Sequence, residues 1–288
     1  MEEFKKLMKG KGYVDSSIKT IYTNIKSITG KKEIKKEYLE DIEDIEENLT
    51  KYKISTQHAI LNSILVYLRL TDEKLLKKYE EIYEPIKISY NETLFYPEVT
   101  SKITWDKVIE YREKYKKMVE KDKEDKQTYF KYLLLSLYTY LPPLRGGEYI
   151  NCICLSGLDD YEGEIKKREK NIYAMDKRKF YMGYTKTIRR TGIRIIDVPQ
   201  ELGDIICDYF ERFHQDNSLL FCKEISSAGL TFCLNSIFGT KVSTSHLRKV
   251  YISSQVPKMD IKERKMLAKI MGHTPQVQEI IYNAMDKK

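Results

Sequence analysis

The sequence lacks the features that mark membrane and secreted proteins. No apolar run approaches the roughly 20 residues that a membrane-spanning helix needs. The first residues, Met1–Lys6, have no signal-peptide character, and no internal repeat or low-complexity segment is present. We therefore expect an intracellular globular protein, located wherever its substrate is.

Cysteine is also scarce, and it is scattered. The five cysteines show no paired spacing typical of a metal site; they are Cys152, Cys154, Cys207, Cys222 and Cys233. An odd, scattered set in a chain without a signal peptide predicts reduced, buried thiols. No cluster of His, Asp and Glu suggests a metal site, so we expect neither a metal nor a cofactor.

Neither positive nor negative charge dominates the sequence. Acidic and basic residues are mixed along most of the chain, and the net charge of +8 permits a polyanionic partner without requiring one. Of the residues, 41% are hydrophobic and 33% are charged, which is typical of a soluble globular protein. A length of 288 residues suggests two domains.

The first domain is expected to be helical over residues 1–82. Ile18, Ile21 and Ile25 share one face of a helical segment, and residues 59–68 form a second, strongly apolar segment. Residues 83–101 contain Pro85 and Pro97, lack a helical period, and are predicted to be a linker.

The second domain, residues 102–288, is predicted to combine helices with one small sheet. Helical patterns cover 105–119 and 128–141 and return from 201 to the end of the chain. Between them, β-like runs cover 171–175, 179–184 and 192–198. The expected fold class is therefore mainly α with a small antiparallel β-sheet.

The end of the chain carries its most informative pattern. Gly272-His273 is followed by Thr274-Pro275, which is typical of a helix N-cap and first helical position. Beyond it, Val277, Ile280, Ile281 and Ala284 form one apolar stripe, and Tyr282 falls on the opposite, polar face. A tyrosine in that place is not needed for a core.

Three landmarks precede it. Arg145 begins a helix with Glu148 three residues later, and Lys186 lies at the turn between two predicted strands. The third landmark is Ser245-His246-Leu247-Arg248. In order and spacing, the four landmarks resemble the catalytic domain of the tyrosine recombinases, the phage-integrase family, over residues 100–288. The segment around Pro142-Pro143 is similar to recombinases of large eukaryotic DNA viruses and their satellites.

The resemblance implies a helical DNA-binding domain, a catalytic domain, and a function as a site-specific recombinase or integrase. Tyr282 would attack a phosphodiester and form a 3′-phosphotyrosyl bond. Arg145 and Arg248 would clamp the charge that develops on the non-bridging oxygens, because guanidinium groups bind phosphate bidentately without changing protonation state.

The remaining residues would move protons or hold the site. Lys186 would protonate the departing 5′-oxygen, because an ammonium can release a proton. His273 would bind the phosphate or accept the tyrosine proton, and Glu148 would orient the site from behind. The family pattern has His three residues before the second arginine; here Ser245 holds that position and His246 follows it. Either residue can fill the role, and strict register favours Ser245.

The resemblance also implies double-stranded DNA as partner and a tetramer assembled on it. Only Asn283–Lys288 follow the tyrosine, so we expect a monomer off DNA. Two alternatives stay open: a type IB topoisomerase, which shares the two arginines, lysine, histidine and tyrosine, and a non-catalytic DNA-binding relative.

Overall fold

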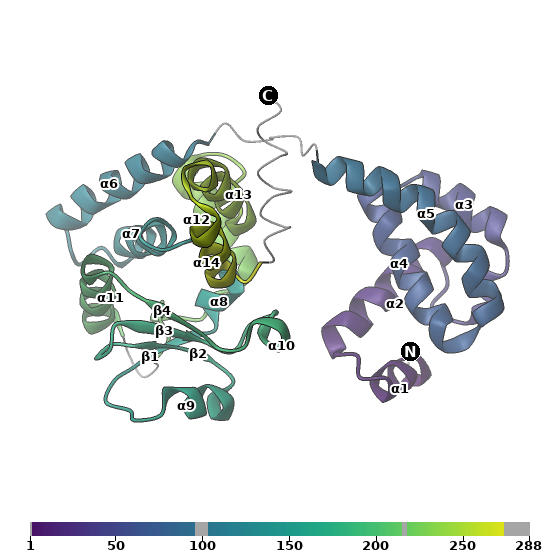
Figure 1. Cartoon of the computed structure of the whole chain (residues 1–288), viewed down its shortest axis with the longest axis horizontal. Coiled ribbons are helices and arrows are strands. Elements are labelled where there is room, and N and C mark those ends of the chain that lie inside the picture. The colour runs from purple at the N-terminus through teal and green to yellow at the C-terminus, as the bar shows by residue number, and fades with distance from the viewer. Residues whose placement is uncertain (1, 96–102, 215–217, 274–288) are drawn as a thin grey trace. The chain divides into compact units, whose positions relative to one another are not determined.

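The structure is a computed structural model that describes residues 2–95, 103–214 and 218–273. The chain divides into two compact units, Met1–Pro97 and Glu98–Lys288 (Figure 1). The fold is mainly helical with one small sheet, as the sequence predicts. Within the described ranges, every helix is too short or too polar to cross a bilayer.

The first unit is helical in its described part. Its elements are α1 (Glu2–Gly10), α2 (Asp15–Thr29), the short 3₁₀ helix η1 (Lys36–Leu39), α3 (Ile42–Thr50), α4 (Ile54–Thr71) and α5 (Glu73–Phe95). The expected apolar face of α2 is confirmed, since Ile18, Ile21 and Ile25 are buried. They pack with Ile60 and Leu61 of α4 in the core of this unit.

The predicted linker is wrong for residues 83–95, because α5 continues to Phe95 with Pro85 inside it. Proline removes one backbone hydrogen bond from a helix and crowds the preceding turn. The helix nevertheless continues, because Ile82 and Ile86 on either side of Pro85 pack against the core of the unit. Burial of this face outweighs the local signal that predicted a break.

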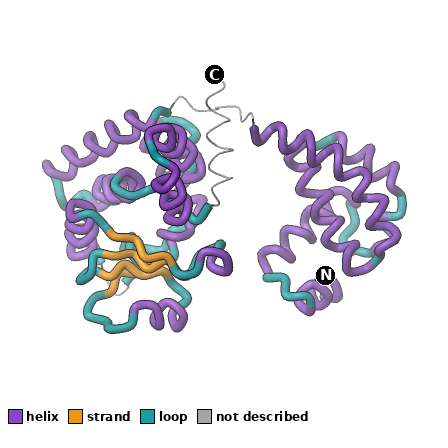
Figure 2. The backbone as a smooth tube through the Cα atoms, viewed as in Figure 1, coloured by secondary structure: helices purple, strands orange, loops and turns teal. Residues whose placement is uncertain are grey.

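The second unit contains a four-stranded mixed sheet, drawn in orange in Figure 2. Its strand order is β1-β2-β3-β4. The strands are β1 (Cys152–Leu155), β2 (Asn171–Ala174), β3 (Lys179–Met182) and β4 (Arg194–Asp197). The last three strands are antiparallel and match the three predicted runs. The first strand was not predicted and pairs parallel to β2, so the sheet is mixed rather than antiparallel. A crossover through α9 (Tyr161–Arg168) makes this parallel pairing possible.

Alternate residues of the strands face two different cores. On one face, Tyr173 and Phe180 join the large core built with helices α6 (Trp105–Lys121), α7 (Lys126–Thr139) and α11 (Gln200–Phe213). On the other face, Ile172 and Tyr181 pack against α9, which lies below the sheet in Figure 1. The remaining elements are α8 (Gly146–Ile150), α10 (Ile188–Thr191), α12 (Ser227–Phe238), α13 (Thr244–Gln255), η2 (Val256–Lys258) and α14 (Ile261–Met271).

Candidate functional site

Arg145 is the N-cap residue of α8, so it begins a helix as the sequence predicts. Glu148, in the first turn, folds back onto it. One carboxylate oxygen of Glu148 accepts from the backbone N–H of Arg145 at 3.4 Å, and the other lies 3.4 Å from its guanidinium Nη1. Glu148 is 3% exposed, whereas the Arg145 side chain is 31% exposed. The arginine can therefore reach a ligand, while the carboxylate lies beneath it.

Arg248 projects from α13 and is buried. Its Nη1 donates to the carbonyl of Pro143 at 2.5 Å, and its Nη2 donates to the carbonyl of Met271 at 3.0 Å. The same Nη2 contacts Nε2 of His273. Burial and the nearby charge of Arg145 lower the pKa of Arg248 to about 10, so the guanidinium is still charged at neutral pH.

His273 is positioned by the end of α14. Gly272 adopts a left-handed conformation there, with φ of 65°. The N–H of His273 bonds the carbonyl of Ala268 at 2.9 Å, and the N–H of Gly272 bonds that of Lys269 at 3.2 Å. This pair of bonds is a Schellman motif, which explains why glycine precedes the histidine.

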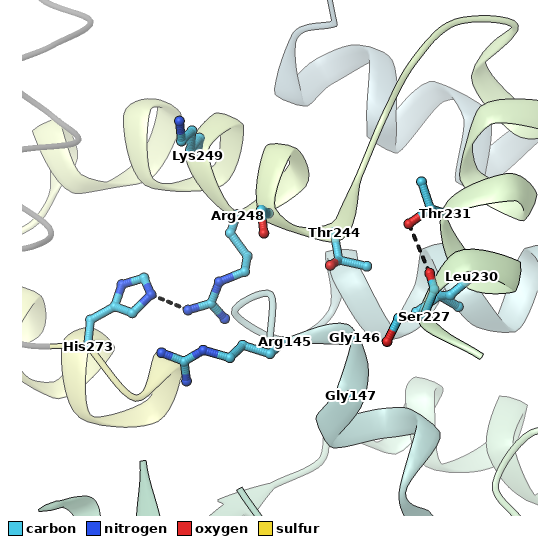
Figure 3. Close-up of a pocket in the computed structure, with 11 residues that line it drawn as sticks. Arg145, Gly146, Gly147, Ser227, Leu230, Thr231, Thr244, Arg248, Lys249 and His273 are labelled. Atoms are coloured by element: carbon cyan, nitrogen blue, oxygen red, sulfur yellow. Dashed lines mark hydrogen bonds between the residues drawn. The ribbon is translucent and has the colours of Figure 1, made fainter. Parts of the chain in front are cut away.

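These three side chains converge on one pocket of about 400 Å³ (Figure 3). Arg145 also donates from Nη2 to the carbonyl of Gly272 at 3.2 Å, which joins α8 to the end of α14. The pocket is also lined by Lys249 and by four hydroxyl side chains, those of Ser227, Thr231, Thr244 and Ser245. Among the described residues, every charged side chain that lines it is positive. The pocket therefore suits an anion that accepts several hydrogen bonds.

Lys186 lies in the turn that follows β3, as predicted, and is exposed. It lines a second hollow of about 490 Å³ that shares Arg145 and Gly147 with the first pocket. Tyr184 and Thr185 line this hollow as well. The two hollows thus meet at Arg145, with the lysine on one side and Arg248 on the other.

Asn171 holds this turn against α8, a role that the sequence did not reveal. The residue is fully buried at the start of β2. Its Nδ2 donates to the carbonyls of Glu148 and Tyr184, at 2.8 and 3.2 Å, and its Oδ1 accepts from the N–H of Tyr184 at 2.8 Å. One side chain thereby fixes the segment leading to Lys186 relative to the helix that carries Arg145.

Ser245 and His246 differ in their relation to the pocket. Ser245 is exposed and lines it, whereas His246 is half-buried and is not among the lining residues. Burial, and then the charge of Lys249, lower the pKa of His246. Of the two residues, Ser245 is therefore the one that lines the pocket.

Arg194 is a buried charge at the site that the sequence interpretation did not single out. It lies on β4 and is 3% exposed. The strand period contains a signal for it, because Arg194 shares a face with Ile196. An arginine on the buried face of a strand needs a partner, and Glu148 supplies one at 2.8 Å.

The proposed nucleophile, Tyr282, and the helix predicted from Thr274 onward lie outside the described residues. Within the described part, no three His, Cys, Asp or Glu residues are arranged to hold a metal ion. The five cysteines carry free thiols; all are buried except Cys207, which is half-buried.

Neither a family model nor a curated protein matches the sequence.

Proposed function

We propose that this chain is a tyrosine recombinase that cleaves and rejoins double-stranded DNA through a 3′-phosphotyrosyl intermediate. The observation that carries the proposal is the convergence of Arg145, Arg248 and His273 on one pocket. They come from three segments far apart in the sequence, and Lys186 lines the hollow that adjoins them. Each of these four residues, taken alone, has an ordinary structural explanation. Together, Arg145, Arg248 and His273 would bind an anion, and Lys186 would donate a proton beside it.

The two guanidinium groups suit a phosphodiester under attack. Attack at phosphorus increases the negative charge on the non-bridging oxygens, and fixed cations stabilise that charge most when water is partly excluded. Arg248 is already held in place by two backbone carbonyls, so its position costs little reorganisation when DNA binds. Ser245 and Thr244 add hydroxyl donors on the same wall of the pocket.

In the proposed reaction, the phenolic oxygen of Tyr282 bonds to phosphorus and the bond to the 5′-oxygen breaks. The phenolic proton passes to His273 or to solvent, and Lys186 gives a proton to the 5′-oxygen as it departs. The DNA 3′-phosphate is then linked to the protein, and the other strand end carries a 5′-hydroxyl. Reversal with a new 5′-hydroxyl rejoins the strand, so the phosphodiester energy is kept.

The helical first unit would contribute further contacts to the DNA backbone, and strand exchange between two duplexes would need four protomers on DNA. The net charge of +8 is compatible with such contacts. The protein would act wherever its DNA substrate is found.

The proposal is tested by denaturant trapping of covalent complexes on a complex DNA library, followed by sequencing of the trapped ends. Wild type is compared with Tyr282→Phe and with Tyr184→Phe, because Tyr184 is 47% exposed beside Lys186 and is the matched control. We expect adducts that map to one short inverted repeat, disappear in Tyr282→Phe and persist in Tyr184→Phe.

The other outcomes have defined meanings. Dispersed adducts that depend on Tyr282 would identify a type IB topoisomerase instead. Adducts that depend on Tyr184 would overturn the assignment of the nucleophile. Intact DNA binding without any adduct would leave a non-catalytic DNA-binding protein.

A further inference from the structure

The buried side chain of Arg194 connects two elements of the candidate site, α8 and α14. Its guanidinium forms an ion pair with Glu148, with Nη2 at 2.8 Å from Oε1. Its Nη1 donates to the carbonyl of Ile270, in the last turn of α14. One buried side chain of β4 therefore contacts both the helix that starts at Arg145 and the helix that ends just before His273.

Glu148 is shared unequally between two arginines. The same Oε1 atom lies 2.8 Å from Arg194 and 3.4 Å from Arg145. A buried carboxylate needs a close cationic partner, because burial without one is strongly unfavourable. Arg194 satisfies this need from the buried side, so Arg145 does not have to.

We infer that Arg194 is a positioning residue, whose pairing with Glu148 leaves the Arg145 guanidinium available to bind phosphate. Without Arg194, Glu148 would keep its charge and draw Arg145 into a close ion pair, out of the pocket. This inference rests on the proposed role of Arg145 as a phosphate ligand.

The atoms around Gly272 are closely packed, so a small shift of Arg145 affects its neighbours. A Cβ atom placed on Gly272 would lie 3.0 Å from Nη1 of Arg145 and 3.4 Å from Nη1 of Arg194. It would also lie 3.0 Å from Oγ1 of Thr187, the residue after Lys186. Arg145, Arg194 and the turn that carries Lys186 therefore all lie close to Gly272. A shift of Arg145 toward Glu148 would change its packing against Arg194 and against this turn.

The test measures binding of inorganic phosphate to the full chain, read from NMR signals of the arginine Nε–H groups. The variants are Arg194→Met, Arg194→Lys and the double variant Arg194→Met/Glu148→Gln. The double variant has the same net charge as wild type, so it separates a loss of positioning from a simple loss of positive charge. Arg212→Met is the matched control, since Arg212 pairs with Asp208 and Glu124 and lines neither hollow.

We expect Arg194→Met to weaken phosphate binding about tenfold or more, the range for losing a hydrogen bond to a charged group. Arg194→Lys and the double variant should bind within about threefold of wild type, because in each of them Arg145 is not drawn away by an unpaired carboxylate. Arg212→Met should bind as wild type does. Should Arg194→Met fail to fold, Arg194→Gln carries the same test with the same expected loss, because glutamine keeps a donor for the carbonyl of Ile270 and leaves Glu148 without the Arg194 cation.

The inference is overturned if Arg194→Met binds phosphate as tightly as wild type, or if the double variant does not recover binding. It is also overturned if wild type shows no response to phosphate at the Arg145 signal. The readout needs neither DNA nor Tyr282. Absence of covalent adducts would reject the recombinase proposal, whereas unchanged phosphate binding in Arg194→Met would reject this inference. The two failures can therefore be distinguished.

Discussion

Replacing Gly272 by alanine should damage the site more than it damages the fold. Gly272 has φ of 65°, a conformation that L-residues adopt at a cost of about 1–2 kcal/mol. The new methyl group would also lie 3.0 Å from the guanidinium of Arg145 and 3.0 Å from the Thr187 hydroxyl. Both contacts are to side-chain atoms that can move by a few tenths of an ångström. The crowding should therefore displace the Arg145 guanidinium more than it lowers the free energy of unfolding.

Gly239 provides the matched control in the same unit. It ends α12 with the same φ of 65°, and a Cβ there would meet nothing within 4 Å. Alanine at either position should therefore lower the free energy of unfolding by a similar amount, about 1–2 kcal/mol. Only Gly272→Ala displaces Arg145. A displacement of a catalytic group by about 1 Å can slow a reaction about 100-fold.

Two measurements on each variant separate the two effects: denaturant unfolding, and single-turnover cleavage of a DNA site recovered by trapping. We expect similar losses of stability, cleavage slowed about three- to tenfold in Gly272→Ala, because a shift of a few tenths of an ångström is only part of that displacement, and cleavage unchanged in Gly239→Ala. Equal cleavage by the two variants would refute the claim that the end of α14 positions Arg145.

Three further predictions follow from the site. Lys186→Ala should slow cleavage by about 100- to 10,000-fold, and DNA with sulfur in place of the bridging 5′-oxygen should restore the rate, because a thiolate departs without a proton; no recovery would exclude Lys186 as the acid. Arg248→Lys should slow cleavage by about 100-fold or more while duplex binding stays within a few fold, because one ammonium cannot replace the fork that bonds Pro143 and Met271; an equal loss of binding and rate would contradict this. The lowered pKa of His246 means that the unfolded chain binds a proton more readily below about pH 6.5, so stability should fall as the pH drops through that region. His246→Gln should flatten the dependence of unfolding free energy on pH between about 7 and 5, and an unchanged slope would show that His246 is not its source.

The sequence predicted the parts of the fold that have a strong local period. The apolar face of α2 and the three antiparallel strands are examples, since each shows its repeat within a few residues. The first strand was missed because Cys152–Leu155 is short and buried, so it lacks the polar alternation that identifies a strand. The extent of α5 was missed because Pro85 is a local signal, whereas the packing of Ile82 and Ile86 is tertiary.

The sequence could predict only those site residues whose role follows from their residue type and their spacing. Arg145, Arg248 and His273 could be proposed from order and spacing, and the structure brings them together. Arg194 and Asn171 could not be proposed in that way, because their roles depend on contacts with Glu148 and Tyr184 across the fold. Residues that hold reactive groups in place have no spacing rule of their own.

The central claim is tested most directly by identifying the bond between protein and DNA. Trapped wild-type complexes are digested with nuclease and protease, and the remaining nucleotide-bearing peptide is sequenced by mass spectrometry. The account predicts a nucleotide joined through its 3′-phosphate to Tyr282, and a free 5′-hydroxyl on the released strand. A nucleotide on any other residue, or one joined through a 5′-phosphate, would contradict it.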